Sequence, residues 1–216
     1  MANKICYIVG SGVFDGRNFA PRTADFIIAA DGGYRYLERM DIMPDLIMGD
    51  FDSLGKIPNH PNVITHPTEK DDTDLMLAVK YAMEHGFKIF CIFGCMGGRT
   101  DMSIATMQTL CYILNNGCTG YVFGENSVVT GVHNGQMFFG TGRSGTISVF
   151  AYGGKAEGVN IKGLRYTMED GTIESDMPIG VSNEFVGTPA SVSVKKGTLI
   201  ITLTNAGFRR EFFGRQ

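Results

Sequence analysis

The sequence predicts an α/β domain with a mostly parallel sheet, followed by an all-β antiparallel sandwich domain. In the first part, short apolar or β-rich segments alternate with segments of helical periodicity, a pattern typical of parallel sheets with helices on their faces. After His133 the helical patterns stop, and short β segments separated by turn residues indicate a small sandwich. We therefore expect two domains, residues 1–133 and 134–216, with no low-complexity linker between them.

The first domain contains six segments that we expect to be strands: Ile5–Val9, Phe26–Ala30, Leu46–Met48, Val63–His66, Lys88–Phe93 and Tyr121–Phe123. Two segments between them, Asp74–His85 and Asp101–Asn116, repeat apolar residues at helical spacing. Gly86 and Gly117 follow these segments and suit the position just after the last helical turn. Strands and helices therefore alternate along this part of the chain.

The second domain contains five expected strands: Gln136–Phe139, Thr146–Ala151, Gly158–Ile161, Ala190–Val194 and Leu199–Thr204. Turn signals separate them, namely Asn134-Gly135, Gly153-Gly154, Asp170-Gly171 and Lys196-Gly197. Short strands joined by such turns predict antiparallel pairing.

Composition and charge narrow the functional classes. The 216 residues are 44% hydrophobic, and the net charge of −3 gives no basic field for nucleic acid. No segment is long enough to span a membrane, and the first residues lack a signal-peptide pattern. The five cysteines are an odd number in apolar surroundings, as expected for free thiols in a reducing cytosol. We therefore expect a cytoplasmic protein that binds neither nucleic acid nor membrane.

Asp50 and Asp52 follow the expected strand Leu46–Met48, and Gly49 lets the chain turn at its end. In open α/β sheets, ligands bind at the carboxyl ends of the strands. Two aspartates separated by one residue can face the same point once the chain leaves extended geometry, and crowded carboxylates need a cation. Mg²⁺ suits them, because it binds carboxylates together with substrate phosphates. The alternative is a turn in which aspartates cap backbone amides.

A second acidic cluster, Lys70-Asp71-Asp72-Thr73-Asp74, lies just before and at the start of the first expected helix. Helix capping explains some of its residues, since Asp and Thr are good caps and acidic groups favour the first turn. Capping does not require all of them, nor the adjacent lysine. A helix start beside a metal site also offers backbone N–H groups to phosphate. Both interpretations stay open for the three residues before Asp74, and a functional role is favoured for Asp74.

A glycine-rich segment, residues 94–101, follows the apolar strand Lys88–Phe93 and leads into the second expected helix. Glycines let the backbone approach phosphates, and Arg99 can grip phosphate oxygens bidentately. Asp101 either caps the helix or fixes Arg99. The segment lacks the Gly-Lys-Ser/Thr ending of a P-loop. Val9-Gly-Ser-Gly12 is an incomplete dinucleotide fingerprint that we interpret as a turn.

Four segments now stand in the order seen in one family: Ala30-Asp-Gly-Gly33, Pro44-Asp-Leu-Ile-Met-Gly-Asp-Phe-Asp-Ser53, Lys70-Asp-Asp-Thr-Asp74 and Gly97-Gly-Arg-Thr-Asp101. The chain resembles the thiamine diphosphokinases (thiamine pyrophosphokinases) over nearly its whole length. The β-rich second half resembles the C-terminal sandwich of that family, and Val181-Ser-Asn-Glu-Phe185 resembles a thiamine-site segment. The resemblance implies a homodimer in which ATP and Mg²⁺ bind the α/β domain and thiamine binds between subunits.

The resemblance also implies roles for individual residues. It places Mg²⁺ on Asp50, Asp52 and Asp74, and ATP on Asp31, Gly32, Gly33, Thr73, Gly97, Arg99 and Asp101. It implies that Lys70 and Arg99 offset developing charge and that Asp71 takes the proton of the acceptor hydroxyl.

Thiamine is expected to contact Tyr166, Ser182 and Asn183. The chain has no Trp, on which some members of the family stack thiamine, so we expect Tyr166 to take that place. Met102 stands where the family often carries a His. From the residues alone, Ser182 and Asn183 fit a β-turn as well as a ligand site.

We therefore predict that the protein transfers diphosphate from ATP to the thiamine hydroxyl, giving thiamine diphosphate and AMP. One alternative is diphosphate transfer to a hydroxymethyl-pterin, which a related fold supports. Another is a non-catalytic nucleotide-binding regulatory module. The density of carboxylates argues against the last, because binding alone rarely needs three converging aspartates.

Overall fold

The computed structural model describes residues 4–52, 55 and 57–204 of the chain. Ser53, the last residue of the second motif, lies outside the described residues. The chain forms two compact units. The first contains the residues up to Thr109 together with Gly120–Glu125, and the second contains Leu110–Thr119 and the residues from Asn126 on. The chain thus enters the second unit at Leu110, returns to the first at Gly120 and stays in the second from Asn126 on. The domain boundary expected at residues 133 and 134 stays a prediction.

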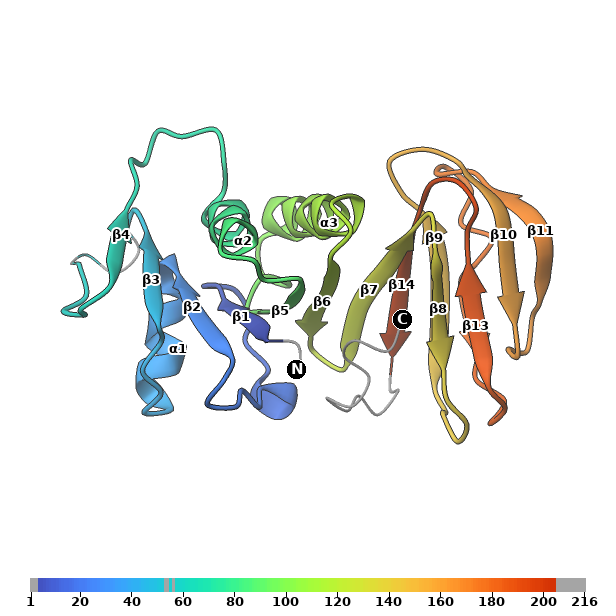
Figure 1. Cartoon of the computed structure of the whole chain (residues 1–216), viewed down its shortest axis with the longest axis horizontal. Coiled ribbons are helices and arrows are strands. Elements are labelled where there is room, and N and C mark those ends of the chain that lie inside the picture. Colours follow the sequence, from blue (N-terminus) through green and yellow to red (C-terminus); the bar gives the residue numbers. More distant parts are fainter. Residues whose placement is uncertain (1–3, 53–54, 56, 205–216) are drawn as a thin grey trace. The chain divides into compact units, whose positions relative to one another are not determined.

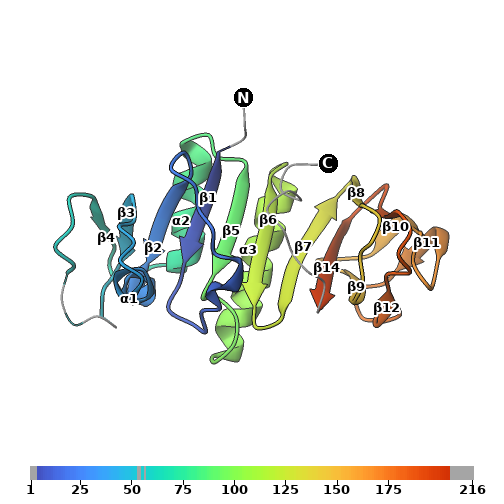
Figure 2. The ribbon, with the colours of Figure 1, turned by 90° about the horizontal axis from the view of Figure 1, so that it is seen from below.

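The first unit contains a sheet in the order β6-β5-β1-β2-β3-β4. Its strands are β1 Ile5–Val9, β2 Phe26–Ala30, β3 Leu46–Gly49, β4 Val63–Thr65, β5 Ile89–Phe93 and β6 Thr119–Gly124. The pairs β1–β2, β1–β5, β2–β3 and β3–β4 are all parallel. Figures 1 and 2 show this order from two directions.

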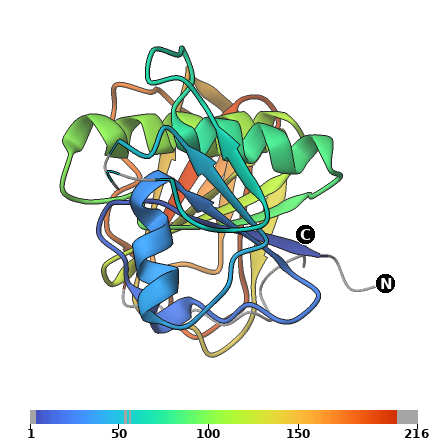
Figure 3. The same ribbon diagram turned by 90° about the vertical axis from the view of Figure 1, so that its left-hand side faces the viewer.

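Helices cover both faces of this sheet, as Figure 3 shows. α2 (Asp74–Glu84) and α3 (Thr100–Asn115) lie over one face, and α1 (Tyr34–Arg39) lies over the other. Two 3-10 turns, η1 (Gly16–Asn18) and η2 (Asp31–Gly33), follow β1 and β2. Because both faces are covered, the strands need continuous apolar sequence, and every residue of β1 and β5 is buried. The stacked rings of Phe93 and Phe123, 4.3 Å apart, add to this core.

The second unit contains two sets of antiparallel strands, in the orders β12-β9-β14-β7 and β11-β10-β13-β8. The strands are β7 Ser127–His133, β8 Gln136–Phe139, β9 Thr146–Ala151, β10 Ala156–Lys162, β11 Met168–Ile173, β12 Asn183–Glu184, β13 Ala190–Ser193 and β14 Thr198–Thr204. Alternate residues of these strands, such as Ile147, Val149, Leu199 and Ile201, share one apolar core. This is the layered arrangement expected of a sandwich.

The predicted fold class is confirmed, including the two long helices and the absence of helix between His133 and Thr204, all of which are described. α1 was not predicted, because six residues are too few to display a helical period. The strands β7, β11 and the two-residue β12 were also not predicted. Within the described residues, no helix is long and apolar enough to cross a membrane.

Candidate active site

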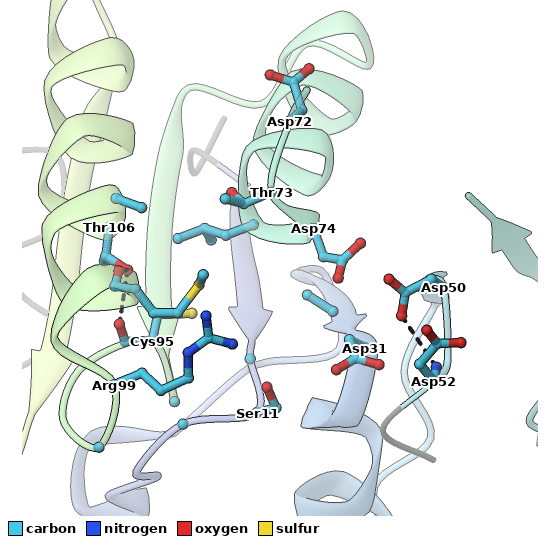
Figure 4. Close-up of a pocket in the computed structure, with 18 of the residues that line it drawn as sticks. Ser11, Asp31, Asp50, Asp52, Asp72, Thr73, Asp74, Cys95, Arg99 and Thr106 are labelled. Carbon is cyan, nitrogen blue, oxygen red and sulfur yellow. Dashed lines mark hydrogen bonds between the residues drawn. The ribbon is translucent and has the colours of Figure 1, made fainter. Parts of the chain in front are cut away.

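A cavity of about 860 Å³ opens in the first unit where β1, β2, β3 and β5 end. Its walls come from the loops after these strands, from the start of α2 and from the first turns of α3. Figure 4 shows the cavity with its labelled side chains. This is the edge of an open α/β sheet at which ligands bind, as the sequence predicted.

The loop after β3 presents Asp50 and Asp52 to this cavity. Gly49 has a φ of 155°, and a Cβ there would lie 3.0 Å from the Cα of Asp31. Phe51 is 3% exposed and has a φ of 60°, so the chain reverses around its buried ring. The Asp50 Oδ1 accepts a hydrogen bond from the Asp52 N–H at 3.2 Å. The turn interpretation therefore holds for Asp50, and that turn also aims both carboxylates at the cavity.

The residues of the cluster before α2 have different partners. The Thr73 hydroxyl caps the helix by accepting a hydrogen bond from the Met76 N–H at 3.2 Å. Asp72 forms an ion pair of 2.6 Å with Lys80, whereas Asp71 is exposed and lines the cavity. Capping thus requires Thr73 alone, which leaves the other residues of the cluster for other roles.

Lys70 lies between two carboxylates. Its Nζ is 2.7 Å from the Asp74 Oδ1 and 3.6 Å from the Asp50 Oδ2. Burial lowers the pKa of Lys70, but the hydrogen bond and charge of Asp74 together with Asp50 outweigh burial and raise it. Burial is also the main reason that the pKa of Asp74 is raised, with Asp50 and Asp31 adding to the shift against the opposing effect of Lys70. The side chains are coupled although their strand and helix lie apart in the sequence.

Asp31, Asp50, Asp52 and Asp74, which we call the acidic corner, lie on the same side of the cavity (Figure 4). Among the described residues, no three His, Cys, Asp or Glu side chains already stand close enough to hold a metal ion. The donor set nevertheless fits a hard divalent cation, which prefers carboxylate oxygens. The ammonium of Lys70 supports this fit, because a cation already lies between two of these carboxylates.

The glycine-rich loop after β5 forms the opposite side of the cavity. Gly94, Gly97 and Gly98 have φ values of 64°, 78° and 73°, which only glycine adopts readily. A Cβ at Gly94 would collide with the carbonyl oxygen of Gly10, so this loop packs directly on the loop after β1. The Gly12 N–H donates to the Gly94 carbonyl at 2.6 Å.

Arg99 ends this loop and lines the cavity. Its guanidinium forms a 2.6 Å ion pair with Asp101, and the two side chains are 71% and 60% exposed. The hydrogen bond from Arg99 lowers the pKa of Asp101. The ion pair agrees with the role of fixing Arg99, and backbone hydrogen bonds at the start of α3 also lower the pKa of Asp101, so both roles considered for it stay open.

Two glycines of the ATP set serve a different purpose from that expected of a ligand contact. Gly32 and Gly33 are buried, and a Cβ at Gly33 would collide with the carbonyl oxygen of Val9. They let η2 pack tightly, while the neighbouring Asp31, at a φ of 48°, faces the cavity. A contact of these two glycines with ATP stays a prediction.

Thr68 and Thr106 of the cavity wall were not predicted, and Ser11 and Cys95 were predicted only as members of their loops. The segment Val9-Gly-Ser-Gly12, interpreted as a turn, does turn, and its residues from Gly10 to Gly12 also line the cavity. The incomplete glycine fingerprint was the signal that indicated it. Thr68 donates from its hydroxyl to the Asp52 Oδ2 at 3.1 Å, a contact that no sequence pattern indicates.

The expected thiamine residues lie in the second unit. Asn183 is 5% exposed, and its Oδ1 accepts hydrogen bonds of 2.9 Å from the N–H groups of Tyr166 and Glu184. Its Nδ2 donates to the Tyr166 carbonyl at 2.6 Å. Tyr166 itself is 60% exposed. The structure thus brings Tyr166 and Asn183 together.

Ser182, at a φ of 58°, donates its N–H to the Ser148 hydroxyl at 3.0 Å. Ser182 lies in a turn, as one interpretation predicted, whereas Asn183 belongs to β12 and bonds mainly to the backbone of the distant Tyr166. A direct contact of either residue with thiamine stays a prediction.

A parallel-sheet domain that sets carboxylates against a glycine-rich loop and an arginine defines a class of enzyme that transfers groups from a nucleoside polyphosphate. The model of the thiamin pyrophosphokinase catalytic domain matches residues 20–122, and that of the thiamin pyrophosphokinase vitamin B1 binding domain matches residues 139–199. The chain belongs to the thiamine pyrophosphokinase family, so the resemblance found in its motifs is confirmed. Members of this family are ATP-dependent diphosphotransferases that generally use a divalent metal.

Individual relatives agree with this assignment. The thiamine pyrophosphokinase of Bacillus subtilis (strain 168) is 25% identical over 181 residues, which cover 81% of this chain and 85% of the relative. A crystal structure of thiamine pyrophosphokinase from Bacillus subtilis has a TM-score of 0.84 at 24% identity, covering 93% of this chain and 99% of that one. The thiamin pyrophosphokinase structure from Geobacillus thermodenitrificans has a TM-score of 0.80 at 20% identity, covering 97% and 100%. These structures share the fold.

Proposed function

We propose that this protein transfers the diphosphate group of ATP to the hydroxyl of thiamine, giving thiamine diphosphate and AMP. The observation that supports this most directly is the cavity of the first unit, where the acidic corner faces the glycine-rich loop inside the catalytic-domain match. The vitamin B1 binding match to residues 139–199 favours thiamine over a pterin as the acceptor. Family membership also favours an enzyme over a regulatory nucleotide-binding module.

We assign the divalent ion, which we propose to be Mg²⁺, to Asp50, Asp52 and Asp74. These side chains supply oxygen donors on one side of the cavity, and the Thr68 hydroxyl, also on the cavity wall, holds Asp52 by a hydrogen bond. When bound there, the ion supplies charge neutralisation for the phosphate oxygens. Asp31 adds a fourth carboxylate to the same corner.

Arg99 and the glycine-rich loop are the proposed phosphate contacts on the opposite side. The planar guanidinium can donate to two phosphate oxygens at once, and the ion pair with Asp101 positions it. The backbone N–H of Gly98 adds a further proposed donor. This arrangement supports catalysis by positioning and by stabilisation of developing charge.

In the proposed reaction, the thiamine hydroxyl oxygen attacks the β-phosphorus of ATP, and the bond to the bridging oxygen of AMP breaks. Asp71 is the proposed acceptor of the hydroxyl proton, since it is an exposed carboxylate on the cavity wall. AMP leaves with the electron pair of the broken bond. Lys70 is the proposed partner of the negative charge that develops on the phosphates.

We propose that Tyr166 stacks on thiamine and that the active protein is a homodimer. Support comes from exposed apolar side chains of the second unit, among them Met177, Ile179 and Val181, which follow one another closely just before β12. The hydrogen bonds of Asn183 favour a positioning role, in which it holds the backbone of Tyr166.

A cytoplasmic location is also proposed, because all five cysteines are free thiols.

The direct test is a turnover assay that detects AMP from ATP with thiamine, and with a hydroxymethyl-pterin, as the acceptor. We expect AMP only with thiamine, in a reaction that a metal chelator stops and Mg²⁺ restores. AMP formation with the pterin alone would establish the alternative enzyme. Nucleotide binding without AMP from either acceptor would establish the binding module.

A further inference from the structure

The ammonium of Lys70 lies where the proposed metal ligands converge. It is 2.7 Å from the Asp74 Oδ1 and 3.6 Å from the Asp50 Oδ2. The three side chains are only 15 to 21% exposed, so water screens this contact poorly. Two carboxylates that are assigned to a divalent ion are therefore already neutralised in part by a cation that belongs to the chain.

A divalent ion cannot share this position with the ammonium. Mg²⁺ binds its oxygen ligands at roughly 2.0–2.1 Å, closer than the contacts that Lys70 makes with these oxygens. The ion and the ammonium would also repel each other at such short range. The ion can therefore bind the Asp74 Oδ1 and the Asp50 Oδ2 only after Lys70 has left them.

A bound nucleotide brings phosphate groups that the displaced ammonium can bind. Lysine carries a compact charge on a flexible four-carbon stem, so its head can move several ångströms while its backbone stays in place. The polyphosphate of a nucleotide enters the same cavity, because Lys70, Asp50, Asp74 and Arg99 all line it. Arg99 is paired with Asp101 and does not contact the acidic corner in this way.

We propose that Lys70 is a displaceable internal cation that competes with the divalent ion at Asp50 and Asp74 until nucleotide arrives. The proposal rests on the proposed function, which places the ion at these carboxylates. In the protein alone, the ammonium weakens metal binding. When the nucleotide binds, the ammonium moves to the phosphates and leaves the carboxylates to the ion, so metal and nucleotide each increase the affinity for the other.

Lys80 provides a matched control. It also forms a close ion pair, 2.6 Å from Asp72 in the same acidic cluster, but this pair does not involve the proposed metal ligands. The two lysines therefore differ in whether they occupy the acidic corner.

The experiment is a titration of Mn²⁺ alone into the full-length chain, followed by electron paramagnetic resonance, for wild type, Lys70→Met and Lys80→Met. It is repeated with an ATP analogue carrying a methylene bridge between the α- and β-phosphorus, without thiamine. We expect Lys70→Met to bind Mn²⁺ alone about tenfold more tightly than wild type. The analogue should tighten Mn²⁺ binding strongly in wild type and much less in Lys70→Met, while Lys80→Met behaves as wild type.

Equal or weaker binding of Mn²⁺ by Lys70→Met would overturn the proposal. Lys70→Gln, which keeps a polar head without charge, must agree with Lys70→Met, and circular dichroism checks that both are folded. Asp50→Asn distinguishes a failure of the metal assignment from a failure of the proposed displacement of Lys70. If it weakens Mn²⁺ binding while Lys70→Met does not change it, the metal assignment survives and the displacement fails. If Asp50→Asn leaves Mn²⁺ binding unchanged, the metal assignment of the proposed function fails, and the displacement fails with it.

Discussion

Replacing Asn183 by alanine tests whether this residue holds the fold or contacts the substrate. Its buried amide makes three hydrogen bonds to the backbone, two of them to Tyr166 and one to Glu184. It thereby fastens the segment before β11 to β12. Alanine removes all three bonds and leaves backbone groups of Tyr166 and Glu184 without this partner.

The magnitude follows from the number of bonds. A neutral hydrogen bond contributes a net value of about 1 kcal/mol to stability, so three bonds predict a loss of about 3 kcal/mol in the free energy of unfolding. The loss is larger if the freed groups stay buried from water, because an unsatisfied buried group costs about 1–3 kcal/mol. Ser182→Ala is the control, because Ser182 is exposed and its recorded bond comes from its backbone N–H. It should stay within about 0.5 kcal/mol of wild type.

Urea unfolding followed by circular dichroism measures the free energies of unfolding of wild type and both variants. Initial rates measure the preference for thiamine over an analogue without its 4-amino group. A positioning role predicts a marked loss of stability for Asn183→Ala. A loss below about 1 kcal/mol would refute the reasoning from the three bonds. If that small loss came with an eroded preference for thiamine, Asn183 would be a direct contact of the aminopyrimidine.

The remaining predictions concern the reacting groups and the assembly. Asp50→Asn and Asp52→Asn should each lower kcat by roughly 10²- to 10³-fold with an unchanged circular dichroism spectrum, and unaltered Mg²⁺ dependence in both would remove them from the metal site. Arg99→Lys should lower kcat by roughly a hundredfold with little change in melting temperature, because Arg99 is exposed and its planar fork is lost. Near-normal activity in a readily unfolding variant would make Arg99 structural. Tyr166→Ala should weaken thiamine binding about tenfold through loss of a cation–π contact, with ATP binding unchanged as the control. Sedimentation should show a dimer at assay concentrations, and a fully active monomer would contradict the proposed assembly.

The secondary structure and the motifs could be predicted because their signals are local. The strand at residues 46–49 and the aspartates after it are adjacent in sequence, so their meeting at a strand end needs no knowledge of packing. The same is true of the glycine-rich loop that leads from β5 into α3. The short helix α1 was missed for the converse reason, since its position depends on the sheet that it covers rather than on a period of its own.

Contacts between distant segments were decided by the tertiary structure. Lys70 reaches Asp50 only because the start of α2 lies beside the end of β3, and Asn183 reaches Tyr166 only because β12 lies beside the segment before β11. The different roles of Asp71, Asp72 and Thr73 likewise depend on the partner that each side chain contacts in the folded chain. The sequence by itself determined the fold class, the family and the chemical types of the site. Which carboxylate meets which cation was decided by packing, because those distances depend on how the sheet brings together segments that are far apart along the chain.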